Sequence, residues 1–226
     1  MEQIPSTEPV YKSPAPEPFY QTWMKALTRP NEQNYIEIAN SPSVNPNKAY
    51  LWLFISGTIT YFVVFGVQLI SLTMQDSITM DAMTVGLALI CGAPIGGAFS
   101  VLVFALSVAL IQWVAKMFKG QGSYTQLAYT FAAFLAPISL ISAGITIFAA
   151  IPFIGILFSL VSIGVSIYAL VLQVLAVKAV NRFGVGEAVG SILLPGLVIG
   201  GFICCLVFAA SIMLGPVIGD MFNGIN

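Results

Sequence analysis

From Ala49 onward the chain is apolar almost without interruption, and this feature constrains the fold more than any other. About 20 consecutive, mostly apolar residues are enough for a helix to cross a bilayer, and several such stretches follow one another up to residue 218. Charged residues make up only 8% of the chain, whereas soluble domains carry roughly a quarter. The sequence therefore predicts an all-α, polytopic membrane helix bundle with about five transmembrane helices.

Polar or proline-containing breaks divide this apolar region into separate spans. Residues 82–95, which include Pro94, leave two interpretations open. They form either a separate piece, interfacial or re-entrant, or the first part of one long, tilted and kinked helix that continues to Met117. The expected spans cover about residues 49–74, 96–117, 124–150, 154–180 and 188–218.

The basic side chains indicate how the bundle is oriented. All eight Lys and Arg residues lie before the first span, between the second and third, or between the fourth and fifth. With five spans, these three segments fall on the same side of the membrane, and short loops rich in Lys and Arg face the cytoplasm. We therefore expect a cytoplasmic N-terminus and a C-terminus on the outside.

Three regions are expected along the chain. Residues 1–17 are rich in Pro, Ser and Glu and are predicted to be a disordered tail, because they have too few apolar side chains to fold. Residues 18–47 are predicted to form cytoplasmic amphipathic or interfacial helices. Residues 48–220 are predicted to form the five-span membrane domain.

An amphipathic helix is expected directly after the tail. Phe19, Trp23 and Leu27 are spaced four residues apart on one face, and Pro30 ends the helix. An aromatic face beside basic residues suits the headgroup layer of a membrane. Packing on a soluble partner or on the bundle's own loops is the alternative. A second short helix is predicted to follow, with Asn31 as its N-cap.

Bases near the ends of the spans are a second set of candidate membrane contacts. Clustered bases beside a bilayer attract anionic headgroups by about 1 kcal/mol each, although setting the topology is by itself a sufficient role for them. The candidate membrane-surface contacts are Phe19, Trp23, Leu27, Lys116, Lys119, Lys178 and Arg182. Glycine pairs four residues apart let helix backbones approach closely, within one chain or between chains. The candidate helix-packing residues are Gly92, Gly96, Gly186, Gly190, Gly196 and Gly200.

The sequence offers no constellation for catalysis. It has no histidine, the most common general base and metal ligand, and its three cysteines lie inside apolar runs without metal-type spacing. No metalloprotease, nucleophile-elbow or phosphate-loop motif occurs. We therefore expect a protein that is not an enzyme, that uses no cofactor or metal, and that has no nucleic-acid partner.

Three stretches of the sequence carry a family resemblance. They are WMKALTRPNEQNYIEIANSP before the membrane, GSYTQLAYTFAAFLAP at the third expected span, and YALVLQVLAVKAVNRFGVGEAVGSILLP from the fourth span into the fifth. They are similar to the Yip family of multi-span membrane proteins, which are named for interaction with Ypt/Rab GTPases. Within the family, the chain resembles the prokaryotic branch. The resemblance, together with the five-span layout, covers about residues 19–218.

The resemblance implies a role at membranes, since better-known members of the family take part in vesicle traffic and bind small GTPases or partner membrane proteins. The Asp-Leu-Tyr-Gly-Pro stretch of the trafficking members is absent here, and Glu187 stands where many relatives have a base. GTPase binding is therefore doubtful. The expected location is a prokaryotic cytoplasmic membrane, or an endomembrane if the host is eukaryotic.

Two functions are compatible with these features. The first is a non-enzymatic scaffold or adaptor whose partners are membrane lipids and either a second membrane protein or another copy of the chain. The alternative is a component for lipid or small-solute transport or permeation, suggested by the prolines and polar side chains within the spans. Ionisable residues mark proton and ion paths, and their absence from the centres of the expected spans favours the first function.

Overall fold

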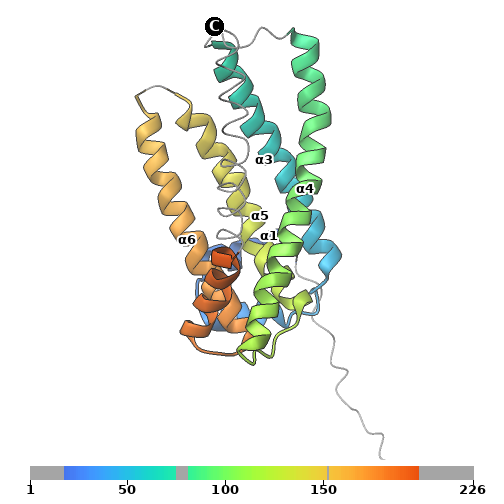
Figure 1. Ribbon diagram of the computed structural model, residues 1–226, viewed down its shortest axis with the longest axis vertical. Coiled ribbons are helices and arrows are strands. Elements are labelled where there is room, and N and C mark those ends of the chain that lie inside the picture. The colour runs from blue at the N-terminus through green and yellow to red at the C-terminus, as the bar shows by residue number, and fades with distance from the viewer. Residues whose placement is uncertain (1–17, 75–80, 152, 199–226) are drawn as a thin grey trace, which may run out of the picture.

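The computed structural model describes residues 18–74, 81–151 and 153–198, and the regular elements within these residues are helices (Figure 1). The predicted disordered tail, residues 1–17, lies outside the described residues. The labelled helices are α1 (Phe19–Thr28), α2 (Glu32–Ala39), α3 (Pro46–Met74), α4 (Ala82–Met117), α5 (Tyr124–Ala149) and α6 (Gly155–Asn181). A shorter apolar helix, Val185–Val198, follows α6.

Four of the described helices, α3 to α6, are long and apolar enough to cross a membrane. Together with the shorter helix at Val185–Val198, they confirm the prediction of a polytopic helical membrane bundle. The first part of the expected fifth span falls on this shorter helix. The rest of that span lies outside the described residues.

The start of each long helix follows from local sequence. Pro46 occupies the first turn of α3, where its missing N–H is not needed, so the helix begins three residues before the expected start of the span. Asp81 caps α4 by accepting a hydrogen bond from the Thr84 N–H at 3.2 Å. At α5, Ser123 and Gln126 form a reciprocal capping box.

Helix α4 resolves the two interpretations of residues 82–95. It runs without a break through Pro94 for 36 residues, so the single long helix is correct and the separate piece is not formed. At 1.5 Å per residue its length is about 54 Å, well beyond the hydrocarbon core of about 30 Å. Proline inside a helix is tolerated in membrane bundles, because neighbouring groups satisfy the carbonyl that it leaves unpaired.

The long helices alternate in direction. In Figure 1, α3 and α5 run away from one end of the bundle and α4 and α6 return to it. We call this end the base; it carries α1, α2, the turn between α4 and α5, and the end of α6. The described Lys and Arg residues lie in these segments or, for Lys48, in the first turn of α3, and they therefore gather at the base. The direction of the base relative to the cytoplasm stays a prediction.

Packing is tightest near the base. Helix α3 packs on α4 and α5, and α5 packs on α6. The buried core is centred on the first half of α5, where Leu127, Tyr129 and Phe134 are almost inaccessible, and it extends to Leu172 of α6. Farther from the base, α3, α4 and α6 expose large apolar side chains on their outer faces, as helices that face lipid do.

Candidate interaction surface at the base of the bundle

Helices α1 and α2 form a hairpin that is closed by one asparagine. The Asn34 side-chain amide donates to the carbonyl oxygens of Lys25 at 2.9 Å and Arg29 at 3.0 Å, at the end of α1. Its own N–H donates to the side-chain oxygen of Asn31 at 2.7 Å, which confirms Asn31 as the N-cap of α2. These two carbonyl oxygens also accept main-chain bonds from the N–H groups of Arg29 and Asn31. The Asn34 amide therefore adds a second donor to each of them and holds α2 against the end of α1.

Tyr35 ties the hairpin to the core of the bundle. Its side chain is fully buried, its hydroxyl donates to the Ala26 carbonyl oxygen at 2.8 Å, and its ring meets that of Phe134 edge-on at 6.2 Å. Burial raises the pKa of the Tyr35 hydroxyl, because a charged phenolate would be poorly solvated there. The hydroxyl therefore stays protonated and remains a donor.

Two further contacts join the hairpin to α6. The Tyr168 hydroxyl donates to the Leu27 carbonyl oxygen, and the Lys178 ammonium lies 2.5 Å from a carboxylate oxygen of Glu32. The side chains of Lys178 and Glu32 are 25% and 41% exposed, and ion pairs with such access to water contribute about 1 kcal/mol or less. Buried hydrogen bonds and packing thus hold the hairpin in place more than charge does.

A row of aromatic rings runs from α1 into the bundle. The ring of Trp23 lies 5.3 Å from that of Phe19 and 5.9 Å from that of Trp52 on α3, and Trp52 lies 5.2 Å from Tyr129 on α5. Edge-to-face and tilted pairs of this kind add about 0.5–1.5 kcal/mol each to the effect of burial. One end of the row is anchored in the core, and the other end, Phe19, is exposed.

The predicted membrane-contact residues of α1 therefore occupy different environments. Trp23 and Leu27 pack against the core of the bundle, whereas Phe19 is 54% exposed. Its outward apolar neighbours are Tyr20 and Met24, which are 55% and 58% exposed. The outer face of α1 is thus made by Phe19, Tyr20 and Met24. Of the three residues that the spacing of four selected, two pack and one is exposed, because periodicity does not tell which side of a helix meets the bundle. Membrane contact by these residues stays a prediction.

The basic turns lie beside the hairpin. Lys116, Lys119 and Arg182 are exposed, and Lys178 is the base that pairs with Glu32. Lys119 and Arg182 both adopt left-handed backbone conformations, with φ of 64° and 56°, which end α4 and α6 sharply. Membrane contact by these bases stays a prediction.

A buried polar pair fixes the turn between α4 and α5. The Gln112 side-chain N–H donates to the Gly122 carbonyl at 2.8 Å and to the side-chain oxygen of Asn181 at 2.9 Å, and the Asn181 carbonyl accepts from the Gln121 N–H at 3.1 Å. Asn181 is fully buried. A side chain on Gly122 would come within 2.6 Å of the Val180 carbonyl oxygen, so only glycine lets the turn lie this close to α6.

The candidate helix-packing glycines differ in their surroundings. A side chain on Gly96 would meet the ring of Tyr61 at 2.3 Å, and one on Gly190 would meet the ring of Phe118 at 3.4 Å. Added side chains at Gly92, Gly186 and Gly196 would meet nothing within 4 Å. Gly200 lies outside the described residues.

A close approach of α3 and α4 involves a glycine that the four-residue spacing did not select. A side chain on Gly97 would lie 2.1 Å from the Thr58 hydroxyl and 3.0 Å from the Phe54 carbonyl oxygen. Gly57 faces the same crossing from α3, where its added side chain would meet the Ser100 hydroxyl at 2.4 Å. The adjacent Gly96–Gly97 pair in the sequence was the signal for this contact, because two neighbouring glycines leave the helix surface flat.

Within the described ranges, no group of three or more His, Cys, Asp or Glu side chains is placed to hold a metal ion. The geometry of the base instead offers an outer apolar face on α1, exposed bases on two turns, and a hairpin held rigidly between them. Such a surface can bind a macromolecule or a lipid layer.

The helices and their apolar outer faces define an integral membrane protein of the helical-bundle class. A family model for the Yip1 domain matches residues 24–213, which is most of the chain. The chain therefore belongs to the Yip1 family. No curated protein and no solved structure matches it significantly.

Proposed function

We propose that this membrane protein is a non-enzymatic scaffold or adaptor whose working surface is the base of the bundle. The observation that carries the proposal is the fixed hairpin, which exposes Phe19, Tyr20 and Met24 although Trp23 and Leu27 of the same helix are packed. Aromatic and methionine side chains are enriched in protein interfaces. A helix that is anchored on one face and apolar on the other is suited to receive a partner.

Charge supports contact with lipid at the same end. The exposed bases Lys116, Lys119 and Arg182 surround the hairpin region, and bases near a bilayer attract anionic headgroups by about 1 kcal/mol each. The proposed partners are thus membrane lipids together with a second membrane protein or another copy of this chain. The lack of histidine and of catalytic motifs in the sequence is consistent with a role that involves no chemical reaction. The proposed location is a prokaryotic cytoplasmic membrane, or an endomembrane in a eukaryotic host.

Photo-crosslinking in native membranes tests the proposal. A benzophenone amino acid is placed at Met24 and, as a matched control, at Phe153, an almost fully exposed apolar residue at the far end of the bundle. We expect Met24 to capture one defined protein, and Phe153 to capture only lipid. Capture of lipid alone from Met24 would instead make α1 a membrane-surface helix and contradict an adaptor surface there.

A second measurement tests whether the outer face is the contact. The double substitution Tyr20→Ser with Met24→Ser removes exposed apolar area without touching the packed face. We expect it to abolish the crosslink formed from a probe at Phe19, while Phe153→Ser leaves that crosslink unchanged. An unchanged crosslink in the α1 double variant would contradict the proposal.

A further inference from the structure

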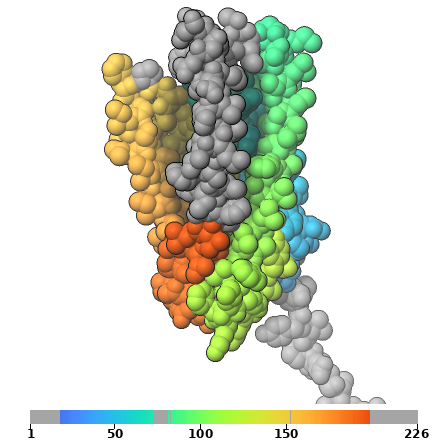
Figure 2. Space-filling view, viewed as in Figure 1, coloured from blue at the N-terminus to red at the C-terminus, as the bar shows by residue number. Residues whose placement is uncertain are grey.

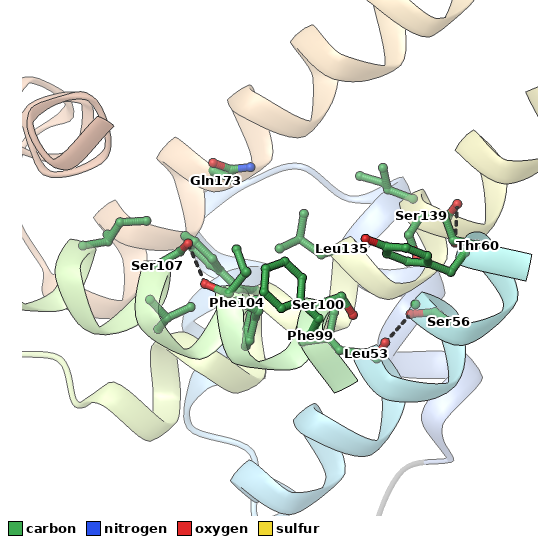
Figure 3. A pocket seen from close by; sticks show the side chains of 17 residues that line it. Leu53, Ser56, Thr60, Phe99, Ser100, Phe104, Ser107, Leu135, Ser139 and Gln173 are labelled. Carbon is green, nitrogen blue, oxygen red and sulfur yellow. Dashed lines mark hydrogen bonds between the residues drawn. The ribbon is translucent and has the colours of Figure 1, made fainter. Parts of the chain in front are cut away.

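A cavity of about 600 Å³ lies among the described helices α3, α4 and α5, with Gln173 of α6 on its remaining side. Figure 3 shows side chains of these four helices around it, with Gln173 across the view from Ser56 and Thr60. Pockets of roughly 300–1,000 Å³ commonly bind organic ligands. The cavity is therefore large enough for a ligand, and its depth and chemistry indicate which class it accepts.

The cavity lies at the depth of lipid tails. Gln173 stands about eight residues before the end of α6, and Ser107 about ten before the end of α4. At 1.5 Å per residue these side chains lie about 12 and 15 Å from the base. Tyr61 is about fifteen residues into α3, or roughly 22 Å from the base. The cavity thus begins on the hydrocarbon side of the headgroup layer at the base and extends toward the middle of the membrane.

The serine and threonine hydroxyls that line the cavity donate their hydrogens within the protein. Thr60 donates to the Ser139 carbonyl oxygen at 3.2 Å, and Ser139 donates to that of Ala136 at 2.8 Å. Ser107 donates to the Val103 carbonyl oxygen at 2.8 Å in the same way. The rest of the wall is mainly aliphatic and aromatic. A cavity whose lining is mainly apolar favours apolar occupants.

The half-buried amide of Gln173 differs from these serine and threonine hydroxyls. Within the described part of the chain, this side chain forms no hydrogen bond. It lies at the end of the cavity nearer the base, where Lys116, Lys119 and Arg182 are exposed. A ligand with an apolar tail, an acceptor carbonyl and a negative headgroup would match these features in this order along the membrane normal.

We infer that the cavity holds one acyl chain of an anionic glycerophospholipid from the leaflet at the base. The ester carbonyl accepts a hydrogen bond from the Gln173 amide, the headgroup phosphate faces the bases, and the tail extends toward Tyr61. A cavity of about 150 Å³ accommodates a benzene ring, so the volume here suits a long chain rather than a small solute. This inference does not depend on the adaptor proposal, because the lipid is a resident ligand and not a partner of α1.

Lipid retention by the full-length protein tests the inference. The protein is incubated with palmitoyl-oleoyl phosphatidylglycerol in detergent and washed. The number of lipids that it retains is then measured by native mass spectrometry. Ser107→Phe fills the cavity, and the matched control Leu106→Phe adds a similar ring to the neighbouring exposed position, which does not line it. We expect one retained lipid in the wild type and in Leu106→Phe, and about tenfold less retention, equivalent to about 1.4 kcal/mol, in Ser107→Phe.

Gln173→Leu provides a second variant if Ser107→Phe fails to fold. It keeps the shape of the wall and removes the donor, so retention should fall by about threefold, the scale of one hydrogen bond between groups in a membrane. Equal retention by wild type, Ser107→Phe and Gln173→Leu would overturn the inference. Absence of retained lipid from the wild type would also overturn it.

A crosslinking arm identifies the occupant directly. A benzophenone amino acid is placed at Val103, which lines the cavity, and at Leu102, which is exposed on the same helix but does not line it. After delipidation in detergent, we expect a phospholipid adduct at Val103 and none at Leu102. Capture of a peptide of the chain itself at Val103 would show that protein fills the cavity and would overturn the inference.

Discussion

At the scale of single residues, two buried asparagines join segments that are distant in the sequence. Asn34 connects the start of α2 to the last carbonyl groups of α1, and Asn181 connects the end of α6 to Gln112 of α4. A primary amide offers two donors and an acceptor, so one side chain can satisfy several main-chain groups. Where removal of such a side chain leaves a buried group without a partner, the cost is usually larger than the net worth of the bond itself.

We predict that Asn34→Ala opens the hairpin. The Lys25 and Arg29 carbonyl groups keep their main-chain donors, the N–H groups of Arg29 and Asn31, but lose the bonds that tie them to α2. Loss of these bonds costs about 1 kcal/mol, which speeds tryptic cleavage after Lys25 by about fivefold. Cleavage of native protein reports local opening, and Ala26 on the other side of the scissile bond is buried. Gln33→Ala, at an exposed position beside it, is the control and should cleave at the wild-type rate. A wild-type rate for Asn34→Ala would contradict the assigned role.

We predict that Asn181→Ala lowers thermal stability. The side-chain oxygen of Gln112 loses its donor inside the protein, so the expected cost is roughly 1–3 kcal/mol. This corresponds to a decrease of about 2–10 °C in the temperature at which half of the protein remains monodisperse in detergent. Gln121→Ala keeps the main-chain bond to Asn181 and should behave as wild type. A decrease of equal size in Gln121→Ala would show that the turn, and not the buried amide, is the sensitive feature.

At the scale of elements, the sequence predicted the helices whose formation depends on residues that are close together in the chain. The short helix α2 was predicted with its cap because an Asn31 side chain reaches the N–H three residues on. The long spans followed from apolar length alone. The continuity of α4 through Pro94 could not be predicted, because it depends on whether surrounding helices support the unpaired carbonyl. The face of α1 that packs, and the roles of Asn34 and Asn181, likewise required knowledge of tertiary contacts.

We predict that alanine has opposite effects at two glycines of α4. Gly97→Ala forces a methyl group against the Thr58 side chain and the backbone of α3, and such overpacking costs about 1–3 kcal/mol. Gly92→Ala meets nothing within 4 Å and gains up to about 1 kcal/mol of helix propensity. Thermal stability in detergent should fall for Gly97→Ala and stay equal or rise for Gly92→Ala. A shift of the same sign and size in both would refute the close crossing of α3 and α4.

At the scale of the whole molecule, polarity is divided along the bundle axis. The base gathers the described bases, the hairpin and the buried polar pairs, whereas the middle of the bundle exposes large apolar side chains. Figure 2 shows the end of α4 and the segment around the end of α6 together at the base. The positions of the bases along the sequence predicted this division. All eight lie before the first span or in alternate connections, and these segments meet at one end of an antiparallel bundle. The cavity above the base was not predicted, since serine and glutamine within the spans are equally compatible with contacts between helices.

The orientation of the bundle is the last prediction, and it concerns all connections together. Single cysteines are placed at Gln121 and Val185 at the base and at Phe153 at the far end, all exposed, in a protein without its natural cysteines. Because the bases should remain in the cytoplasm, a maleimide that cannot cross the membrane should label only position 153 in intact cells. In inside-out vesicles it should label only positions 121 and 185. Labelling of 121 and 185 from opposite sides would contradict two crossings by α5 and α6, since only an even number of crossings returns the chain to the same side.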